Sequence, residues 1–331
     1  MLSRRSFGLC LALLITGCSG SAPTSPPAGD KPGGTKEAPA AAASDRKIGV
    51  SLLTFQNPFF KIIADTIASE GDKHGYKTIQ LSADQDPKLQ DQQVKDFIAQ
   101  KVSAIVISPC VAKAIVPSIQ EANKAGIPVF TVDIPCREEG VDIVCQIATD
   151  NFDGGRQAAR AMIEALGPSG GKVAVLGFKQ AESCILRVDG FKAELDAYNA
   201  EHPNRIDIAV ELDGGGAKDA GLRAMDDALQ STTDLKGVFA INDPSALGAL
   251  AAIEKAKKEK EITIVGFDGQ KEGREAILEG KIYADPIQFP DRMGIEAVNA
   301  IVAHSKGADV PKEIKIPTSL YKKADAEKEF R

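Results

Sequence analysis

The chain has 331 residues, 43% of them hydrophobic, which is enough for two domains of ordinary size, each with its own core. A formal net charge of −6, with no Lys/Arg-rich cluster beyond the extreme N-terminus, gives no reason to expect a nucleic-acid partner. No internal run approaches the roughly 18 apolar residues that a membrane-spanning helix needs.

The first 18 residues are typical of an export signal. Arg4 and Arg5 supply positive charge, residues 9–16 form a short apolar core, and small residues lead up to Cys18. A cysteine at this place resembles the acylated cysteine of bacterial lipoproteins, so the sequence predicts a lipoprotein signal peptide with Cys18 as its lipidation site. The arginine pair also resembles a twin-arginine signal, which leaves two export routes open.

Residues 19–45 are rich in Ser, Pro, Gly and Ala and predict a flexible tether, because such a composition buries no core. Its reach is on the order of 30 Å. An acylated Cys18 and this tether together predict an exported, lipid-anchored protein, located in the periplasm or on the outer face of the cytoplasmic membrane.

From residue 46 onward, apolar β-branched runs alternate with helix-like segments. This repetition predicts a parallel sheet that is covered by helices on both faces. The strands expected in the first half are 48–54, 78–82, 104–108, 128–133 and 143–148, and the helices are 59–74, 88–100 and 113–125.

The alternation then starts again, which indicates two similar α/β lobes rather than one sheet of about ten strands. The strands expected in the second half are 172–177, 206–212, 237–241, 262–267 and 282–289. The helices expected there are 154–166, 185–199, 217–230, 245–258, 273–279 and 293–303.

The stretch between the first strand and the first helix has two interpretations. Asn57 can cap the helix, Pro58 suits its first position, and Phe59 and Phe60 can pack in the core. Alternatively, the two rings and the Asn57 amide line a binding cleft, because ligands of doubly wound folds bind where a parallel strand hands over to a helix.

Polar residues follow several of the predicted strands. They are Asp133, Asn242, Asp268 and Gln288. Each has a local alternative as a helix cap, a turn or a loop residue. Together with aromatic rings they suit a neutral polyhydroxyl ligand, since carboxylates accept from hydroxyls, and amides both donate and accept.

A series of motifs gives the chain a specific resemblance. They are Asn57-Pro58-Phe59-Phe60, Gly126-Ile127-Pro128-Val129, Asp150-Asn151, Arg187-Val188-Asp189-Gly190-Phe191, Phe239-Ala240-Ile241-Asn242-Asp243 and Val265-Gly266-Phe267-Asp268-Gly269. With them, residues 46 to about 321 resemble the periplasmic sugar-binding proteins of ABC transporters, of the ribose-binding type. LacI-type repressors share this fold but begin with a DNA-binding helix-turn-helix, whereas this chain begins with an export signal.

The resemblance implies the type I periplasmic binding protein fold, in which two doubly wound parallel-sheet lobes are joined by a hinge of three crossings. The N-terminal lobe would comprise 46–149 with 289–317, and the C-terminal lobe 150–288 with 318–331. The ligand contacts that the resemblance implies are those of Asn57, Phe59, Phe60, Asp133, Asn151, Asn242, Asp268 and Gln288.

The chain departs from the ribose-binding pattern at three positions. Ile134 and Ile185 stand where ribose-binding members carry arginines, and Gly216 falls where they carry an aromatic ring. Two lost charged donors remove hydrogen bonds worth ~1.5–3 kcal/mol each. We therefore expect a ligand other than ribose, a small polyol-like molecule with an apolar edge against Ile134 and Ile185, such as a deoxy- or methyl-sugar.

Four cysteines lie within the predicted lobes, and an even number in an exported domain indicates disulfides. The pairing that the spacing favours is Cys136–Cys145, and the rival is Cys110–Cys136. Four free buried thiols, Cys184 included, are the third possibility. The spacings match no common zinc pattern, so no metal is expected.

The sequence thus predicts a monomeric substrate-binding lipoprotein of an ABC-type sugar importer. A monosaccharide or polyol would bind between the lobes, and the closed form would dock on a membrane permease. The alternative is a sensor that presents the bound sugar to a membrane kinase or chemoreceptor. No enzyme activity and no cofactor are expected, since there is no nucleophile elbow and no phosphate-binding glycine loop.

Overall fold

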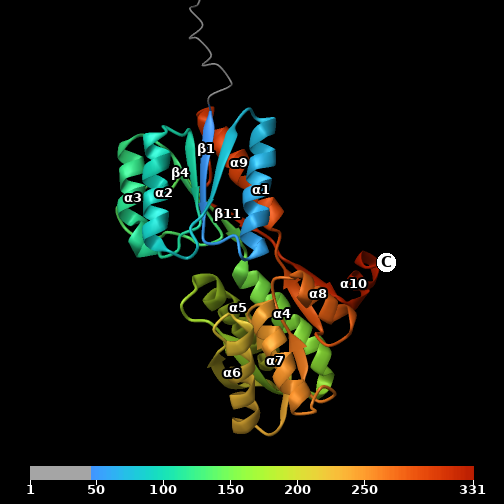
Figure 1. Ribbon diagram of the computed structural model, residues 1–331. Helices are drawn as coiled ribbons and strands as arrows, with labels where there is room; N and C mark the ends of the chain where they lie inside the picture. Colours follow the sequence, from blue (N-terminus) through green and yellow to red (C-terminus); the bar gives the residue numbers. More distant parts are fainter. Residues whose placement is uncertain (1–45) are drawn as a thin grey trace, which may run out of the picture. The chain divides into compact units, whose positions relative to one another are not determined.

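The computed structural model describes residues 46–331, which contain two six-stranded sheets (Figure 1). The predicted signal, tether and Cys18 lie outside the described residues. The first sheet contains β1 (Lys47–Leu52), β2 (Lys77–Ser82), β3 (Ala104–Ile107), β4 (Val129–Val132), β5 (Cys145–Thr149) and β11 (Glu313–Ile316). The second contains β6 (Gly171–Gly177), β7 (Ile206–Asp213), β8 (Leu235–Ala240), β9 (Thr263–Val265), β10 (Ala284–Ile287) and β12 (Ser319–Lys322).

Both sheets are doubly wound. The first has the order β11-β5-β4-β3-β1-β2 and the second the order β12-β10-β9-β8-β6-β7. All pairs are parallel except β10–β12, which is antiparallel. The predicted fold class, two parallel-sheet α/β lobes, is confirmed.

Helices cover both faces of each sheet, so each lobe has two apolar layers. Around the first sheet they are α1 (Pro58–Lys73), α2 (Pro87–Ala99), α3 (Ala112–Lys124) and α9 (Pro290–Ser305). Around the second they are α4 (Asn151–Leu166), α5 (Glu182–Glu201), α6 (Lys218–Ser231), α7 (Asp243–Lys255), α8 (Lys271–Leu278) and α10 (Lys323–Glu329), and the 3₁₀ turn η1 (Gly167–Ser169) follows α4.

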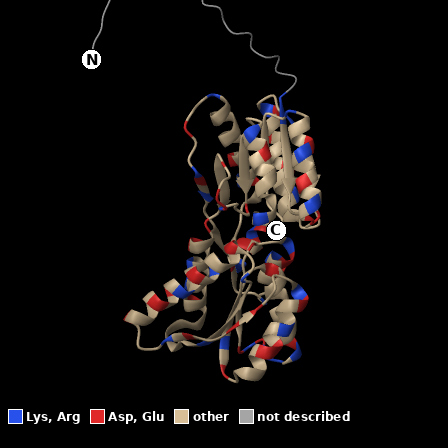
Figure 2. Ribbon diagram, turned by 90° about the vertical axis from the view of Figure 1, so that its left-hand side faces the viewer, with Lys and Arg blue, Asp and Glu red and all other residues tan. Residues whose placement is uncertain are grey.

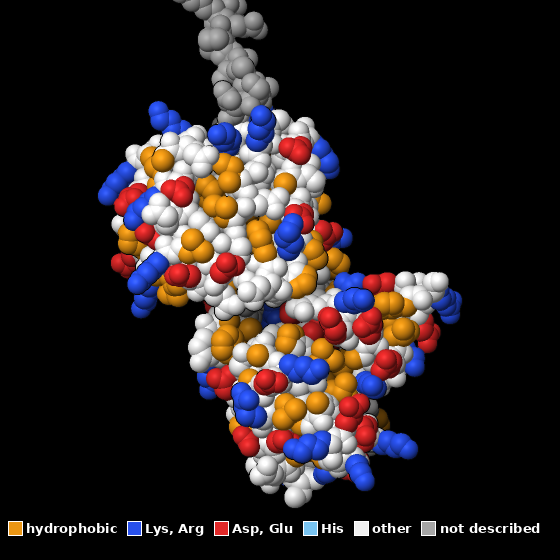
Figure 3. Space-filling view, viewed as in Figure 1, with side chains coloured by type: hydrophobic (Ala, Val, Ile, Leu, Met, Phe, Trp, Pro, Cys, Tyr) orange, Lys and Arg blue, Asp and Glu red, His pale blue; other side chains and the backbone are white. Residues whose placement is uncertain are grey.

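The charged residues lie mainly on the helices and loops, while the central strands are largely uncharged (Figure 2). On the face shown in Figure 3, hydrophobic side chains lie among polar and charged ones rather than in one large patch. No helix among residues 46–331 combines the length and the apolar character needed to cross a membrane.

Two of the helices begin with side-chain caps, of which the cap at Asn57 was predicted from the sequence. The Asn57 side chain caps α1 by accepting from the Phe59 amide (3.0 Å), and Pro58 is the first helical residue. At α2 the Asp86 side chain accepts from the Lys88 amide (2.8 Å). These local signals require no tertiary contact, which is why the sequence predicts the helix starts well.

Two strands and the last helix escape the sequence pattern. They are β11, β12 and α10. β11 is four residues long and pairs with β5, so that Glu313 lies beside Gln146. Such a short edge strand owes its conformation to a partner far away in the chain, and no local periodicity reveals it.

The chain passes between the sheets three times, from β5 to α4, from β10 to α9 and from β11 to β12. The first and second crossings are joined to each other by a hydrogen bond, in which Thr149 Oγ1 donates to Gln288 Oε1 (2.6 Å). The lobe boundaries placed at these crossings stay a proposal.

The predicted Cys136–Cys145 disulfide is wrong, because all four cysteines of the described chain are free. Cys145 points into the layer between the first sheet and helices α1 and α9. Cys136 packs in the layer under α2 and α3, where its thiol contacts the main-chain oxygen of Ala112 (3.6 Å). The sheet thus separates two thiols that lie near each other in the sequence. The rival Cys110–Cys136 pairing is not formed either.

Helices α4 and α5 approach each other closely through two glycines. A Cβ atom on Gly190 would lie 2.0 Å from the main-chain oxygen of Phe152, and one on Gly155 would lie 2.0 Å from that of Arg187. Neither contact can relax by a side-chain movement, so both positions require glycine. The contact fixes α5, which carries Arg187.

We predict that Gly190→Ala destabilises the protein by about 1–3 kcal/mol, because the added methyl group forces two helix backbones apart. Gly177→Ala is the matched control, since a Cβ there would meet its nearest atom at 3.7 Å. Denaturant unfolding of both variants measures the difference. Equal stability of the two variants would show that the helices accommodate the methyl group.

Candidate functional site

The candidate site lies at the carboxyl ends of the parallel strands. Asp133 follows β4 of the first sheet, while Asn242, Asp268 and Gln288 follow β8, β9 and β10 of the second. Doubly wound sheets bind their ligands at this edge. The four polar residues therefore occupy the edges at which the sequence predicts a cleft.

Arg187 of α5 joins the polar groups of the second lobe. Its Nη1 donates to Asp268 Oδ1 (2.9 Å) and to the main-chain oxygen of Ile241 (2.7 Å). Its Nε donates to Asn151 Oδ1 (2.8 Å), and its guanidinium lies 3.9 Å from the ring centroid of Phe267. The side chain is almost fully buried, so an ion pair, two neutral acceptors and a ring replace the water that this cation loses.

Asp268 is held from two sides. Besides Arg187, Gln288 donates through Nε2 to the same carboxylate oxygen (2.6 Å). The backbone of Asp268 has φ = 99°, a left-handed conformation that costs a non-glycine residue of order 1 kcal/mol or more. Burial raises the pKa of Asp268, although Arg187 and Gln288 counteract this effect.

Asp133 offers a carboxylate whose hydrogen-bonding capacity is unused. Among residues 46–331 no donor forms a hydrogen bond with its side chain, and its backbone is also left-handed (φ = 60°). Burial raises its pKa to about 6, with Arg187 lowering it and Asp268 raising it further. Asp133 and Asp268 thus share the field of one buried cation.

Two asparagines of the second lobe form hydrogen bonds with other protein groups. Asn151, which accepts from Arg187, also donates to the main-chain oxygen of Thr149 (3.1 Å). Asn242 caps α7 by accepting from the Ser245 amide (3.0 Å), while its Nδ2 donates to the main-chain oxygen of Gly216 (2.9 Å). The cap role of Asn242 is observed, and its ligand contact stays a prediction.

Phe59 and Phe60, the two adjacent rings at the start of α1, have different roles. Phe60 is 5% exposed and packs in the core beside α9, whereas Phe59 is half-buried and lines a cavity. The ring centroids are 5.4 Å apart and the rings meet edge to face. Phe59 is therefore the ring available for stacking, and Asn57 uses its Oδ1 as the helix cap.

Two cavities are lined by segments of both lobes. One, of about 590 Å³, is lined by Phe59 from α1 together with Asp268 and Gln288. The other, of about 160 Å³, has Asp133 and Asn151 among its lining residues. Phe59 thus shares one cavity with Asp268 and Gln288, and Asp133 shares the other with Asn151, whereas Asn242 lines neither of the two.

The three departures from the ribose-binding pattern lie in different surroundings. Ile134 packs against the core of the first lobe, and Ile185 is 40% exposed. A Cβ on Gly216 would lie 3.4 Å from the Asn242 amide nitrogen and 3.9 Å from the ring of Phe178. Phe178 therefore brings a ring of the second lobe to the neighbourhood of Gly216 from a different segment.

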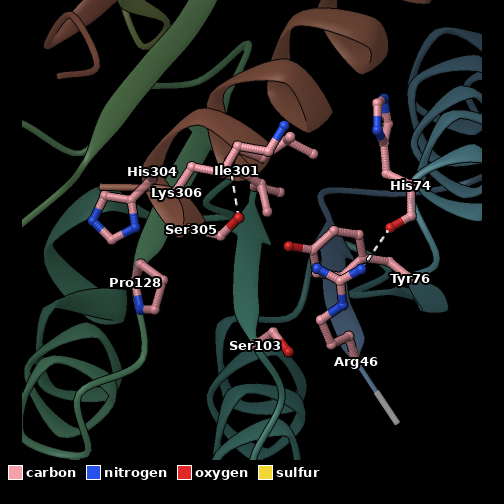
Figure 4. Close-up of a pocket in the computed structure, with 10 residues that line it drawn as sticks. Arg46, His74, Tyr76, Ser103, Pro128, Ile301, His304, Ser305 and Lys306 are labelled. Atoms are coloured by element: carbon pink, nitrogen blue, oxygen red, sulfur yellow. Dashed lines mark hydrogen bonds between the residues drawn. The ribbon is translucent and has the colours of Figure 1, made fainter. Parts of the chain in front are cut away.

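A cavity of about 630 Å³ lies at the opposite end of the first sheet (Figure 4). Arg46 donates there to the main-chain oxygen of His74 (2.9 Å) and lies 4.6 Å from the ring centroid of Tyr76. This end of the sheet holds the amino ends of the parallel strands, where doubly wound folds do not bind their ligands. None of the predicted site residues lines this cavity.

Sequence reasoning missed Arg187 and Phe178 as site residues. Arg187 is part of a recognised motif, but its direction depends on how α5 packs on α4. One signal was present, because an arginine between Leu186 and Val188 stands among apolar neighbours of a predicted helix. Phe178 lies in the turn after β6, and no periodicity indicates where its ring points.

The arrangement suits an uncharged ligand that carries many hydroxyl groups. It combines one free carboxylate, one carboxylate held by a buried arginine, primary amides and an aromatic ring. Among residues 46–331 no group of three or more His, Cys, Asp and Glu side chains is placed to hold a metal ion.

A sequence model described as "Periplasmic binding protein domain" matches residues 48–309. The chain is 33% identical to the ribose import binding protein of Bacillus subtilis (strain 168) over 308 residues, which cover 93% of this chain and 94% of that protein.

Solved structures are similar over most of the chain. One is an ABC transporter solute-binding protein from Mycobacterium smegmatis with bound glycerol, at 31% identity and a TM-score of 0.74, covering 86% of this chain and 96% of that one. Another, from Mycobacterium smegmatis in complex with β-D-fucofuranose, has 25% identity and a TM-score of 0.74, covering 86% of this chain and 93% of that one.

We predict that Arg187→Gln destabilises the protein strongly at pH 8, by about 3–5 kcal/mol, because it leaves Asp268 and Asp133 as buried charges without a cation. The loss should be smaller at pH 5. Both carboxyl groups already have raised pKa values, so they take up protons as the pH falls and the missing cation matters less. Thermal unfolding at the two pH values measures the difference.

Arg160→Gln is the control, since Arg160 is exposed and pairs with Glu194 (2.7 Å) on the surface. It should change stability little at either pH. Adding Asp268→Asn to Arg187→Gln should recover part of the loss at pH 8. An equal loss at pH 5 and pH 8 would mean that Arg187 acts through packing alone.

Proposed function

The chain belongs to the periplasmic binding protein family, and from this membership we propose that it is the substrate-binding protein of an ABC-type sugar importer. It binds a monosaccharide or related polyol between its two lobes. The observation that carries this proposal is the pair Asp133 and Asp268, one from each lobe, which line the two cavities between segments of both lobes.

The chemistry of the pair explains why hydroxyl groups suit the site. The Asp133 carboxylate has its acceptor positions free, and a half-buried acceptor gains most from a donor that the ligand brings. Asp268 is already oriented by Arg187 and Gln288, so it accepts a further hydroxyl with little loss of side-chain entropy. The Phe59 ring offers a face for the C–H groups of a sugar.

Binding requires no reaction and no cofactor. Because the ligand contacts come from both lobes, bound sugar favours a form in which the lobes are close together. Arg137, which follows β4, pairs with Glu182 at the start of α5 (3.0 Å), and both residues line the smaller cavity, so an ion pair also joins the lobes there. The closed form is the one that a membrane permease distinguishes from the empty protein.

The ligand has an apolar edge. The arginine positions of the ribose-binding pattern hold Ile134 and Ile185, and Arg187 donates through Nε and Nη1 to protein acceptors. A sugar that lacks one hydroxyl group fits a site in which two apolar side chains replace two charged donors. The similar structure with bound β-D-fucofuranose, a deoxy sugar, supports this proposal.

The anchor and the location follow from the sequence. Export, acylation at Cys18 and a tether over 19–45 hold the binding protein at the outer side of the membrane, where the importer meets its substrate. The protein acts as a monomer, because one chain supplies both walls of the site.

We predict that Asp133→Ala abolishes sugar binding without lowering the stability of the unliganded protein. A thermal-shift screen of monosaccharides and polyols identifies a stabilising sugar, which at a hundredfold excess over its Kd adds about 2.7 kcal/mol to the wild type. The variant should show no shift, and its unliganded Tm should be unchanged or higher, because a carboxyl group with a raised pKa has been removed.

The matched control is Asp142→Ala, an exposed aspartate of the same lobe, which should keep the full shift. If the unliganded Asp133→Ala protein melted well below the wild type, Asp133 would be structural. A screen with no stabilising sugar or polyol would remove the proposed function.

We predict that Ile185→Arg improves binding of D-ribose relative to D-fucose by tenfold or more, because one charged hydrogen bond is worth ~1.5–3 kcal/mol. Ile185 is 40% exposed, so the longer side chain fits without repacking. Calorimetric titration of both sugars measures the ratio of affinities. Val111→Arg, at an exposed residue outside the site, is the control, and an unchanged ratio in Ile185→Arg would mean that this edge does not select the ligand.

A further inference from the structure

Two aspartates lie buried beneath the second-lobe half of the site. Asp243 is the first residue of α7 and is 1% exposed, and Asp285 in β10 is 0% exposed. Neither belongs to the predicted ligand contacts. Two adjacent buried carboxyl groups are costly, so their surroundings need an explanation.

These carboxyl groups have almost no donors. Asp243 Oδ2 accepts from the main-chain amide of Gln270 (2.5 Å). Among residues 46–331 no hydrogen bond of ordinary geometry reaches Asp243 Oδ1 or either carboxyl oxygen of Asp285, although the Gly266 amide lies close enough to lower the pKa of Asp285. Ionised carboxylates only accept, so two of them facing each other would both lack partners.

Two glycines bring backbone against the pair. A Cβ on Gly273 would lie 2.0 Å from Asp243 Oδ1, and a Cβ on Gly266 would lie 2.5 Å from Asp285 Oδ1. Each carboxyl group therefore lies against the backbone of one glycine. A proton on one carboxyl group supplies the donor that these surroundings lack.

The electrostatics agree with a retained proton. Burial raises the pKa of Asp285 to about 6 and that of Asp243 well above its ordinary value, and Asp285 raises the latter further. Asp268 adds negative charge to both. The cation of Arg274 on α8 acts on Asp285, and Tyr321 of β12, the register partner of Asp285, donates its hydroxyl to Glu329 of α10.

The pair is connected to three second-lobe segments of the site, those that carry Asn242, Asp268 and Gln288. Asn242 immediately precedes Asp243 in the sequence. Gln270, whose main-chain amide donates to Asp243, lies two residues after Asp268. Asp285 lies three residues before Gln288 in the same extended segment. We propose that Asp243 and Asp285 share one proton and that this acid pair positions the segments carrying Asn242, Asp268 and Gln288.

The positioning role rests on the proposed sugar-binding function, whereas the shared proton does not. The folded state binds a proton that the unfolded chain releases above about pH 4, the ordinary range of aspartate. Stability contributed by the shared proton is therefore present at low pH and falls as the pH rises through the raised pKa values of the pair.

The test is the pH profile of the full chain with Asp285→Asn, compared with the wild type and with Asp207→Asn, an exposed aspartate paired with Arg205. The side-chain amide that Asp285→Asn introduces can donate to Asp243 without a shared proton. We expect the variant to melt at least about 2 °C above the wild type at pH 8, with a smaller difference at pH 5. Asp207→Asn should follow the wild-type profile.

Infrared spectroscopy of the wild type provides a measurement that does not depend on a variant folding. The carbonyl-stretch band of a protonated carboxyl group should be present at pH 7 and should disappear in Asp243→Asn, which keeps an acceptor for Gln270. If the wild type lacks this band, or if Asp285→Asn has the same melting profile as the wild type, the shared proton does not exist.

Positioning is tested by titrating D-ribose and D-fucose from pH 7 to pH 10. Wild-type affinity should fall at least threefold as the pair loses its proton, and Asp285→Asn should show a flatter profile. Parallel profiles would overturn the positioning role.

If neither sugar binds, the proposed function fails, and hydrogen exchange at the Gln270 amide decides positioning. The positioning role is supported if, after allowance for intrinsic rates, this amide exchanges faster above pH 8 in the wild type than in Asp285→Asn. Equal protection in the two proteins rejects the positioning role.

Discussion

The ion pair between Arg187 and Asp268 is the interaction on which the site depends. A buried guanidinium needs acceptors that replace its water, and here an aspartate, an asparagine and a main-chain oxygen accept from its Nε and Nη1. The same cation limits the rise in the pKa of Asp133 across the site. Its place is fixed in turn by Gly190 and Gly155, which allow α5 to lie against α4. Helix packing thus determines the electrostatics of the cleft.

Much of the fold was predictable because its signals are local. Alternating apolar strands and helix-like segments are visible within windows of a few residues, and Asn57 marks a helix start without any tertiary information. The polar residues after β4, β8 and β9 were predictable for a similar reason. A parallel strand ends at a known edge of the sheet, so a side chain that follows it is placed by topology alone.

What escaped prediction depends on contacts between distant segments. Cys136 and Cys145 are near in sequence, yet the sheet puts their thiols into different layers. The ring of Phe178 reaches the neighbourhood of Gly216 from another turn. Position 216 alone therefore indicates that the aromatic ring of the ribose-binding pattern is missing, although the fold places a different ring nearby. The direction of Arg187 likewise requires the packing of two helices. These are properties of the assembled lobe, and neither spacing nor periodicity encodes them.

The two halves of the site differ in how far they are organised before a ligand arrives. Asp268, Gln288 and Asn242 all make hydrogen bonds within residues 46–331, so ligand binding costs them little conformational entropy. The Asp133 side chain makes no such bond and keeps its full capacity for a hydroxyl donor. In the proposed binding mode the organised half orients the ligand, and the free carboxylate of Asp133 gains a partner only on binding. The largest differential contact would then lie at Asp133, and a differential contact is what shifts a two-lobed protein between its states.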